Sequence, residues 1–145
     1  MPIWFGPTTP ENLNERARGT MLTQLGIEFT EIGEDSLTAR MPVDHRTVQP
    51  AGILHGGASA TLAESLGSVA ATLCIDPARK RCVGLEINAN HVRAVRSGYV
   101  TGTATPVHIG KSTQIWQIRI QDEKDRLVCI ARLTLAILEV TNGVG

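Results

Sequence analysis

The 145-residue sequence has no excess charge of either sign, because 14 basic side chains balance 14 acidic ones. It therefore lacks the basic surface typical of proteins that bind nucleic acid or anionic membranes, and we predict neither partner. It also lacks a long apolar run: Glu64 and Arg132 interrupt the longest apolar stretches, which fall short of the ~20 residues needed to span a bilayer. Balanced charge gives weak colloidal protection, which favours a defined oligomer.

Cysteine is scarce and irregularly spaced. Cys74, Cys82 and Cys129 form no C-x-x-C pair, and an odd count without a disulfide framework favours a reducing compartment. We interpret all three as small core residues. The N-terminal residues lack a basic segment followed by an apolar one, so we expect no secretory signal and predict a cytoplasmic protein.

The chain has the length of one domain, 1–145, which would bury roughly 68–70% of its unfolded surface. We expect residues 1–8 and 141–145 to be frayed. The run Thr8-Thr9-Pro10-Glu11 predicts the start of a short helix that ends near Gly19. A second helical turn is expected around 21–24, stopping at Gly26.

Alternating apolar residues predict strands in most of the rest of the chain, over 27–32, 37–43, 83–90, 100–105, 116–121 and 129–137. A long helix, roughly Gly56 to Cys74, interrupts them and is ended by Asp76-Pro77. One helix cannot cover both faces of a six-stranded sheet. We therefore predict an α+β fold in which a strongly curved antiparallel sheet wraps around that helix.

The long helix has a single ionisable carboxylate, Glu64, in the stretch AGILHGGASATLAESLGSVAATLC. Among small apolar residues we expect this carboxylate to lose hydration, so that it is paired, protonated or reactive. The alternative is an ordinary exposed glutamate. Leu62, Leu66, Val69 and Leu73 share a face that should press into the sheet. The face of Glu64 should admit a ligand or partner backbone, because its residues are small: Gly57, Ala60, Thr61, Gly67, Ser68 and Ala71.

The start of this helix offers unpaired N–H groups that can polarise an electrophile. Gly56 and Glu64 are eight residues apart, or ~12 Å along a helix, whereas a base must come within ~3 Å of the group it serves. One helix cannot bring both to one carbonyl. Two copies packed antiparallel about a two-fold axis can, so the spacing predicts a site shared between subunits.

Short motifs around this helix form a specific pattern: Gln49-Pro50, Leu54-His55-Gly56-Gly57, Leu62-Ala63-Glu64-Ser65, Gly67-Ser68, Asn88-x-Asn90-His91 and Arg96-x-Gly98. From roughly Asn12 to Leu138 the chain resembles the hotdog-fold acyl-CoA thioesterases. The resemblance is to the branch of phenylacetate-pathway and 4-hydroxybenzoyl-CoA thioesterases. Within it the chain is most similar to enterobactin-proofreading and 1,4-dihydroxy-2-naphthoyl-CoA thioesterases.

The resemblance implies a hydrolase in which Glu64 attacks the thioester carbonyl or activates water. It implies that the Gly56 N–H, with His55 beside it, polarises the thioester oxygen and that Gln49 holds the carbonyl or the water. Ser68 and His91 would line the same pocket. The coenzyme A arm of the substrate would contact Gly84, the segment His91, Val92, Arg93 and Ala94, and the turn His108, Ile109, Gly110, Lys111, Ser112 and Thr113. Arg93 and Lys111 suit its phosphates. The relatives also suggest a homotetramer, a dimer of dimers.

No cofactor or metal is needed, because a thioester is already a good acyl donor and the four histidines lack metal-ligand spacing. The sequence leaves open whether Glu64 acts as nucleophile or general base. It also leaves open whether the acyl group is carried by coenzyme A or by a carrier protein. An aromatic or a medium-chain acyl group would occupy an apolar pocket, for which the candidates are Met21, Leu22, Val69, Thr72, Leu73 and Trp4. Two other classes remain as alternatives: a hydratase or dehydratase on the same fold, and a non-catalytic acyl-CoA-binding module.

Overall fold

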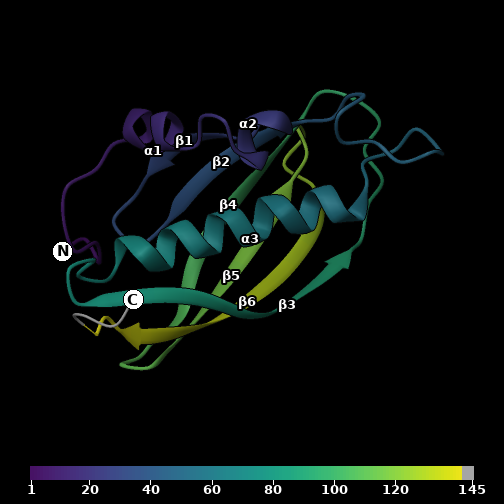
Figure 1. Cartoon of the computed structure of the whole chain (residues 1–145). Helices are drawn as coiled ribbons and strands as arrows, with labels where there is room; N and C mark the ends of the chain where they lie inside the picture. The colour runs from purple at the N-terminus through teal and green to yellow at the C-terminus, as the bar shows by residue number, and fades with distance from the viewer. Residues whose placement is uncertain (142–145) are drawn as a thin grey trace.

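The computed structural model describes residues 1–141 and has the α+β architecture that the sequence predicts, a curved antiparallel sheet around one long helix (Figure 1). The sheet order is β1-β2-β4-β5-β6-β3, so β1 and β3 form its edges. The elements are α1 (Pro10–Arg16), α2 (Met21–Gln24), β1 (Glu28–Ile32), β2 (Leu37–Pro42), α3 (Gly56–Leu73), β3 (Lys80–His91), β4 (Tyr99–Ile109), β5 (Thr113–Gln121) and β6 (Leu127–Glu139). Within the described residues, no helix is long and apolar enough to cross a membrane.

The core lies between α3 and the concave face of the sheet. Leu62 and Leu66 of α3 are fully buried there, together with Trp116 of β5 and Leu133 of β6. Gly67 also faces the sheet, because a Cβ at that position would lie 2.7 Å from Leu133 Cδ2. Our prediction that Gly67 belongs to the open face of Glu64 was therefore wrong. The glycine is explained by the close approach of helix to sheet.

Strand β3 departs from the predicted alternation. Its pairing with β6 shifts register between Gly84 and Glu86, so the side-chain pattern changes face along the strand. Val83 and Leu85 are 38% and 63% exposed, whereas Ile87 and Ala89 are half-buried against the core. The prediction that these four residues share one face was wrong, because a period-2 pattern cannot reveal a bulge.

The N-terminal segment is fixed to the rest of the fold, contrary to the expectation that residues 1–8 fray. The Trp4 indole stacks on Trp116 with ring centroids 6.3 Å apart and donates a hydrogen bond to the Gly33 carbonyl. The Phe5 N–H donates to the Leu73 carbonyl at the end of α3. At the other end of the chain, residues 142–145 of the expected tail lie outside the described residues.

Candidate active site

The start of α3 is capped by its own histidine. His55 lies at the N-cap, and its Nδ1 accepts the Gly57 N–H at 2.7 Å. Within residues 1–141 no acceptor takes the Gly56 N–H. The His91 ring lies directly beside this group, since a Cβ on Gly56 would be 2.8 Å from His91 Nε2. The helix start thus presents a free amide next to an imidazole.

A cavity of about 400 Å³ opens at this helix start. Gln49 contributes to it from the preceding loop, where its Oε1 accepts the Ala51 N–H and leaves the amide nitrogen able to donate to a ligand. The structure therefore brings together several of the predicted residues from three segments. The lining consists of Gln49, Ile53, Leu54, Gly56, Ser59, His91, Val92, Arg93, Ala94 and Val128.

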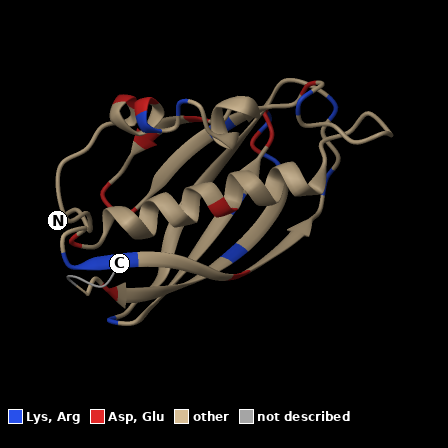
Figure 2. Cartoon of the chain, viewed as in Figure 1, with Lys and Arg blue, Asp and Glu red and all other residues tan. Residues whose placement is uncertain are grey.

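Glu64 lies two turns further along α3, on the side that faces away from β5 and β6. Figure 2 shows this acidic position midway along a helix that has no other charged residue. The carboxylate approaches β3, because a Cβ on Gly84 would be 4.0 Å from Glu64 Oε1. In the single chain Glu64 is exposed, so the expected loss of hydration is not found there. It lines a cavity of about 440 Å³ with Met21, Leu22, Thr61, Ser65, Ser68 and Val69.

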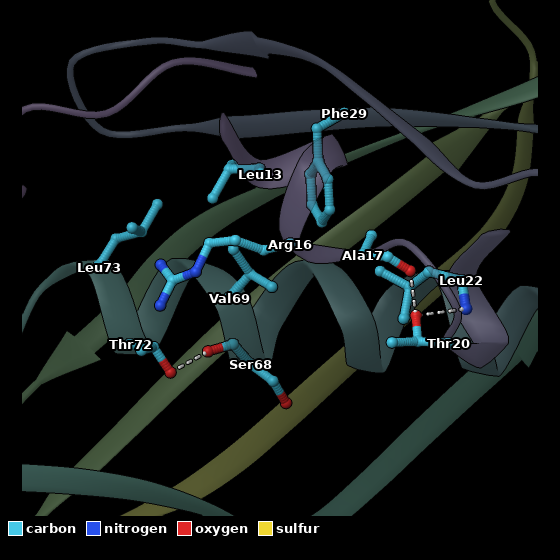
Figure 3. A pocket seen from close by; sticks show the side chains of 10 residues that line it. All are labelled: Leu13, Arg16, Ala17, Thr20, Leu22, Phe29, Ser68, Val69, Thr72 and Leu73. Atoms are coloured by element: carbon cyan, nitrogen blue, oxygen red, sulfur yellow. Dashed lines mark hydrogen bonds between the residues drawn. The ribbon is translucent and has the colours of Figure 1, made fainter. Parts of the chain in front are cut away.

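An apolar cavity of about 310 Å³ continues from the Glu64 cavity and shares Leu22, Ser68 and Val69 with it (Figure 3). It lies between α1, α2 and the second half of α3. The structure places four expected acyl-pocket residues in its lining: Leu22, Val69, Thr72 and Leu73. Met21 lines only the Glu64 cavity, and Trp4 lines neither, because it stacks on Trp116 instead.

Sequence reasoning missed the other side of this apolar cavity. Leu13 and Arg16 of α1 and Phe29 of β1 complete it. The spacing of Leu13 and Arg16 places them on one face of α1, which is a signal that could have been used. Which element that face meets depends on the tertiary fold. Helix α1 is held against β1 by Asn14, whose side chain accepts the Phe29 N–H at 2.8 Å and donates to the Phe29 carbonyl at 2.9 Å.

The residues expected to hold coenzyme A do not meet within one chain. The segment 91–94 lies at the end of β3 beside the start of α3, whereas Lys111 and Gly110 share a cavity with Lys80 at the start of β3. Twelve residues of extended strand separate these ends, or roughly 35–40 Å. Gly84 lies between them. Within one chain, the residues expected to hold coenzyme A therefore form two separate groups.

One aspartate in the loop before α3 and the three cysteines have shifted pKa values. Arg46 donates to the Asp44 carboxylate, at 2.6 Å from its Nη2, and this ion pair lowers the pKa of Asp44 to about 2. The pair joins two residues of the loop that leads to Gln49. Burial raises the pKa of Cys74 to about 12 and also raises the pKa of Cys82 and Cys129, so none of these thiols is a ready nucleophile.

Comparison with known proteins identifies a common family. The thioesterase superfamily model matches residues 51–129. The chain is 57% identical to a 1,4-dihydroxy-2-naphthoyl-CoA hydrolase of Escherichia coli, over 94% of this chain and 99% of that protein. It is 50% identical to the proofreading thioesterase EntH of Cronobacter turicensis, over 94% and 98% of the two chains.

Solved structures agree with the sequence comparison. A thioesterase of Haemophilus influenzae superposes with a TM-score of 0.94 at 48% identity and covers 99% of both chains. A Staphylococcus aureus protein that is 37% identical superposes with a TM-score of 0.80, over 83% of this chain and 99% of that one. It was crystallised with a glutamate changed to alanine, and separately with a glutamine changed to alanine 15 positions earlier. Gln49 and Glu64 are also 15 positions apart.

Proposed function

The chain belongs to the thioesterase superfamily and is a thioester hydrolase, and from this premise we propose that it hydrolyses an aroyl- or medium-chain acyl-CoA to the free acid and the thiol. The relatives are named as hydrolases and thioesterases, which favours hydrolysis over the two alternatives, a hydratase or dehydratase and a non-catalytic acyl-CoA-binding module. A carrier-protein thioester is the second substrate candidate, because it presents the same phosphopantetheine arm. The 1,4-dihydroxy-2-naphthoyl-CoA hydrolase is the relative that favours an aromatic acyl group.

One observation carries the proposal: two complementary half-sites lie apart on one chain. The free Gly56 amide and Glu64 are eight residues apart on α3, and the two cationic ends of the coenzyme A site lie at opposite ends of β3. A two-fold axis that packs two α3 helices and two β3 edges antiparallel would bring each half-site to its complement. It would also cover the exposed Val83 and Leu85 and the unpaired edge of β3. We infer a homodimer with two shared sites, and a dimer of dimers as the full assembly.

In this site the Gly56 N–H of one chain donates to the thioester oxygen, and the dipole of α3 adds to the polarisation. Glu64 of the other chain then acts in one of two ways. It attacks the carbonyl carbon to give an anhydride and expel the coenzyme A thiolate, and water opens the anhydride. Alternatively, it takes a proton from a water that attacks directly.

Six further side chains complete the proposed machinery. Gln49 donates from its amide nitrogen to the carbonyl or to the water, and His91 lies against Gly56 at the same carbonyl. His55 caps the start of α3 through its Nδ1. Ser68, one turn beyond Glu64, lies where the Glu64 cavity meets the apolar cavity. Arg93 and Lys111 bind phosphates of the substrate arm from different chains.

The matching spacing of the glutamine and glutamate replaced in the S. aureus relative supports the assignment of Gln49 and Glu64. The first test is thiol release from benzoyl-, hydroxybenzoyl-, naphthoyl- and hexanoyl-CoA. We expect catalysis with at least one of them. Release at the uncatalysed rate across the whole panel would refute the proposed substrate class.

The shared site is tested by complementation. Glu64→Ala and Gln49→Ala are each expected to be nearly inactive. In a mixed dimer of the two variants, one of the two sites combines the wild-type Glu64 of one chain with the wild-type Gln49 of the other, so activity should return. Mass spectrometry verifies that mixed dimers form. Mixed dimers as inactive as their parents would show that each site is built within one chain.

A further inference from the structure

The apolar cavity next to Glu64 contains one charged side chain, Arg16, whose role the hydrolysis mechanism does not require. The other lining residues, all uncharged, are Leu13, Ala17, Thr20, Leu22, Phe29, Ser68, Val69, Thr72 and Leu73. In Figure 3 the Arg16 side chain reaches from α1 toward Leu73 and Thr72 of α3. Arg16 is exposed, so its guanidinium stays hydrated at the rim of this apolar cavity.

The charge of Arg16 is available to a ligand. Within residues 1–141, the ion pairs of the neighbouring helix residues involve Arg18 with Glu15 at 3.2 Å, and no carboxylate lies within 4.0 Å of the Arg16 guanidinium. No described hydrogen bond uses its side-chain nitrogens either. The polar groups nearest to it in the lining are already engaged, since the Thr72 hydroxyl donates to the Ser68 carbonyl at 2.8 Å.

Contacts between α1 and β1 fix where Arg16 lies relative to α3. The bonds of Asn14 to Phe29 hold α1 against β1, and Leu13 is buried beneath it. Thr72 lies eight residues beyond Glu64 on the same helix, a rise of ~12 Å. An acyl group whose carbonyl carbon is at Glu64 would therefore pass Ser68 and Val69 and bring its far end to Arg16.

We infer that Arg16 is a specificity-determining residue that selects acyl groups with an oxygen acceptor, a carboxylate or a hydroxyl, at the end distant from the thioester. The apolar walls suit the flat or linear body of such a group, and a guanidinium can bind a carboxylate with two parallel hydrogen bonds. The cavity volume of about 310 Å³ is in the range of sites for small organic molecules. This inference rests on the proposed function, because it requires the acyl group to extend from Glu64 into this cavity.

The test compares two substrates that differ only at the far end, 2-naphthoyl-CoA and 6-carboxy-2-naphthoyl-CoA. The quantity measured is the ratio of kcat/KM for the carboxylated substrate to that for its parent. We expect Arg16→Met to lower this ratio roughly tenfold or more, as for the loss of a charge-assisted hydrogen bond. Arg16→Lys should retain part of the preference. The matched control is Arg18→Met, which removes a surface cation two residues away and should leave the ratio unchanged.

A charge reversal gives a second, gain-of-function readout. Arg16→Glu should invert the preference, so that 6-aminomethyl-2-naphthoyl-CoA becomes a better substrate than the carboxylated compound. If the ratio does not fall in Arg16→Met, or falls equally in Arg18→Met, Arg16 does not select the acyl group. Failure of the proposed function looks different: the wild type would then hydrolyse neither naphthoyl thioester.

Discussion

The two sides of helix α3 differ sharply in how completely one chain buries them. On the sheet side, Leu62, Ala63, Leu66 and Ala70 are fully buried, and Gly67 allows the helix to lie close to Leu133. On the other side, Glu64 is exposed and lines one of two adjoining cavities. The packed side holds the fold together, whereas the open side contains the polar groups proposed for chemistry. Residues on the two sides should therefore respond to substitution in different measurements.

The largest effect is expected at Glu64, and only on catalysis. Glu64→Gln keeps the size of the side chain but removes the nucleophile or base, so kcat should fall by about 10²–10⁴-fold. The free energy of unfolding should change by less than ~0.5 kcal/mol, because the side chain is exposed. Thiol release and urea denaturation measure the two quantities. Glu31→Gln, at an exposed position on β1, is the control and should retain full activity.

On the packed side the largest effect should be on stability. Leu66 is fully buried and rests on β4, where a Cβ on Gly102 would be 2.7 Å from Leu66 Cδ1. Leu66→Ala leaves a cavity and should lower the free energy of unfolding by about 2–5 kcal/mol. Urea denaturation checks this value. An equal loss in Ser65→Ala, on the open side, would contradict the distinction between the two sides.

A smaller effect is expected at Gly67. Alanine favours helix by ~1 kcal/mol over glycine, but here the added methyl would lie 2.7 Å from Leu133 Cδ2 and 3.4 Å from Ile118 Cδ1. Overpacking of this kind costs about 1–3 kcal/mol, so we expect Gly67→Ala to destabilise by roughly 1 kcal/mol in total. A gain in stability by urea denaturation would show that the helix has room to move away from the sheet.

The smallest effect is expected in the loop on the open side. The pKa of Asp44 is lowered from 3.8 to about 2 by the ion pair with Arg46, so the pair stabilises the fold above pH 3.8. That contribution is lost as the pH falls from about 4 toward 2. Asp44→Asn should remove this part of the acid sensitivity, which is small because the pair is exposed. Thermal unfolding between pH 2 and pH 5 tests it, and an unchanged acid limb would argue against the pair.

Much of the fold was predictable because its patterns are local. The start of α3 follows from the run His55-Gly56-Gly57, and the buried face of β6 follows from alternation of apolar residues. The bulge in β3 was not predictable, because an inserted residue changes pairing without changing composition. Trp4 was placed wrongly for a similar reason: its partner Trp116 is more than a hundred residues away in sequence.

The candidate site divides in the same way. The segments that contain Gln49, Gly56 and His91 were identified from motifs, and the structure gathers them around one cavity. Arg16 escaped notice, because nothing in α1 reveals that its face lies over the second half of α3.

The sequence alone determined three features: the helix with one carboxylate, the residues at its start and the strands that surround it. Each depends on periodicity and capping within a few residues. Only the tertiary structure decided which sides of α3 are packed and open, and which α1 residues complete the apolar cavity. The physical reason is that burial depends on contacts between segments distant in the chain, and no local pattern specifies how closely two backbones approach.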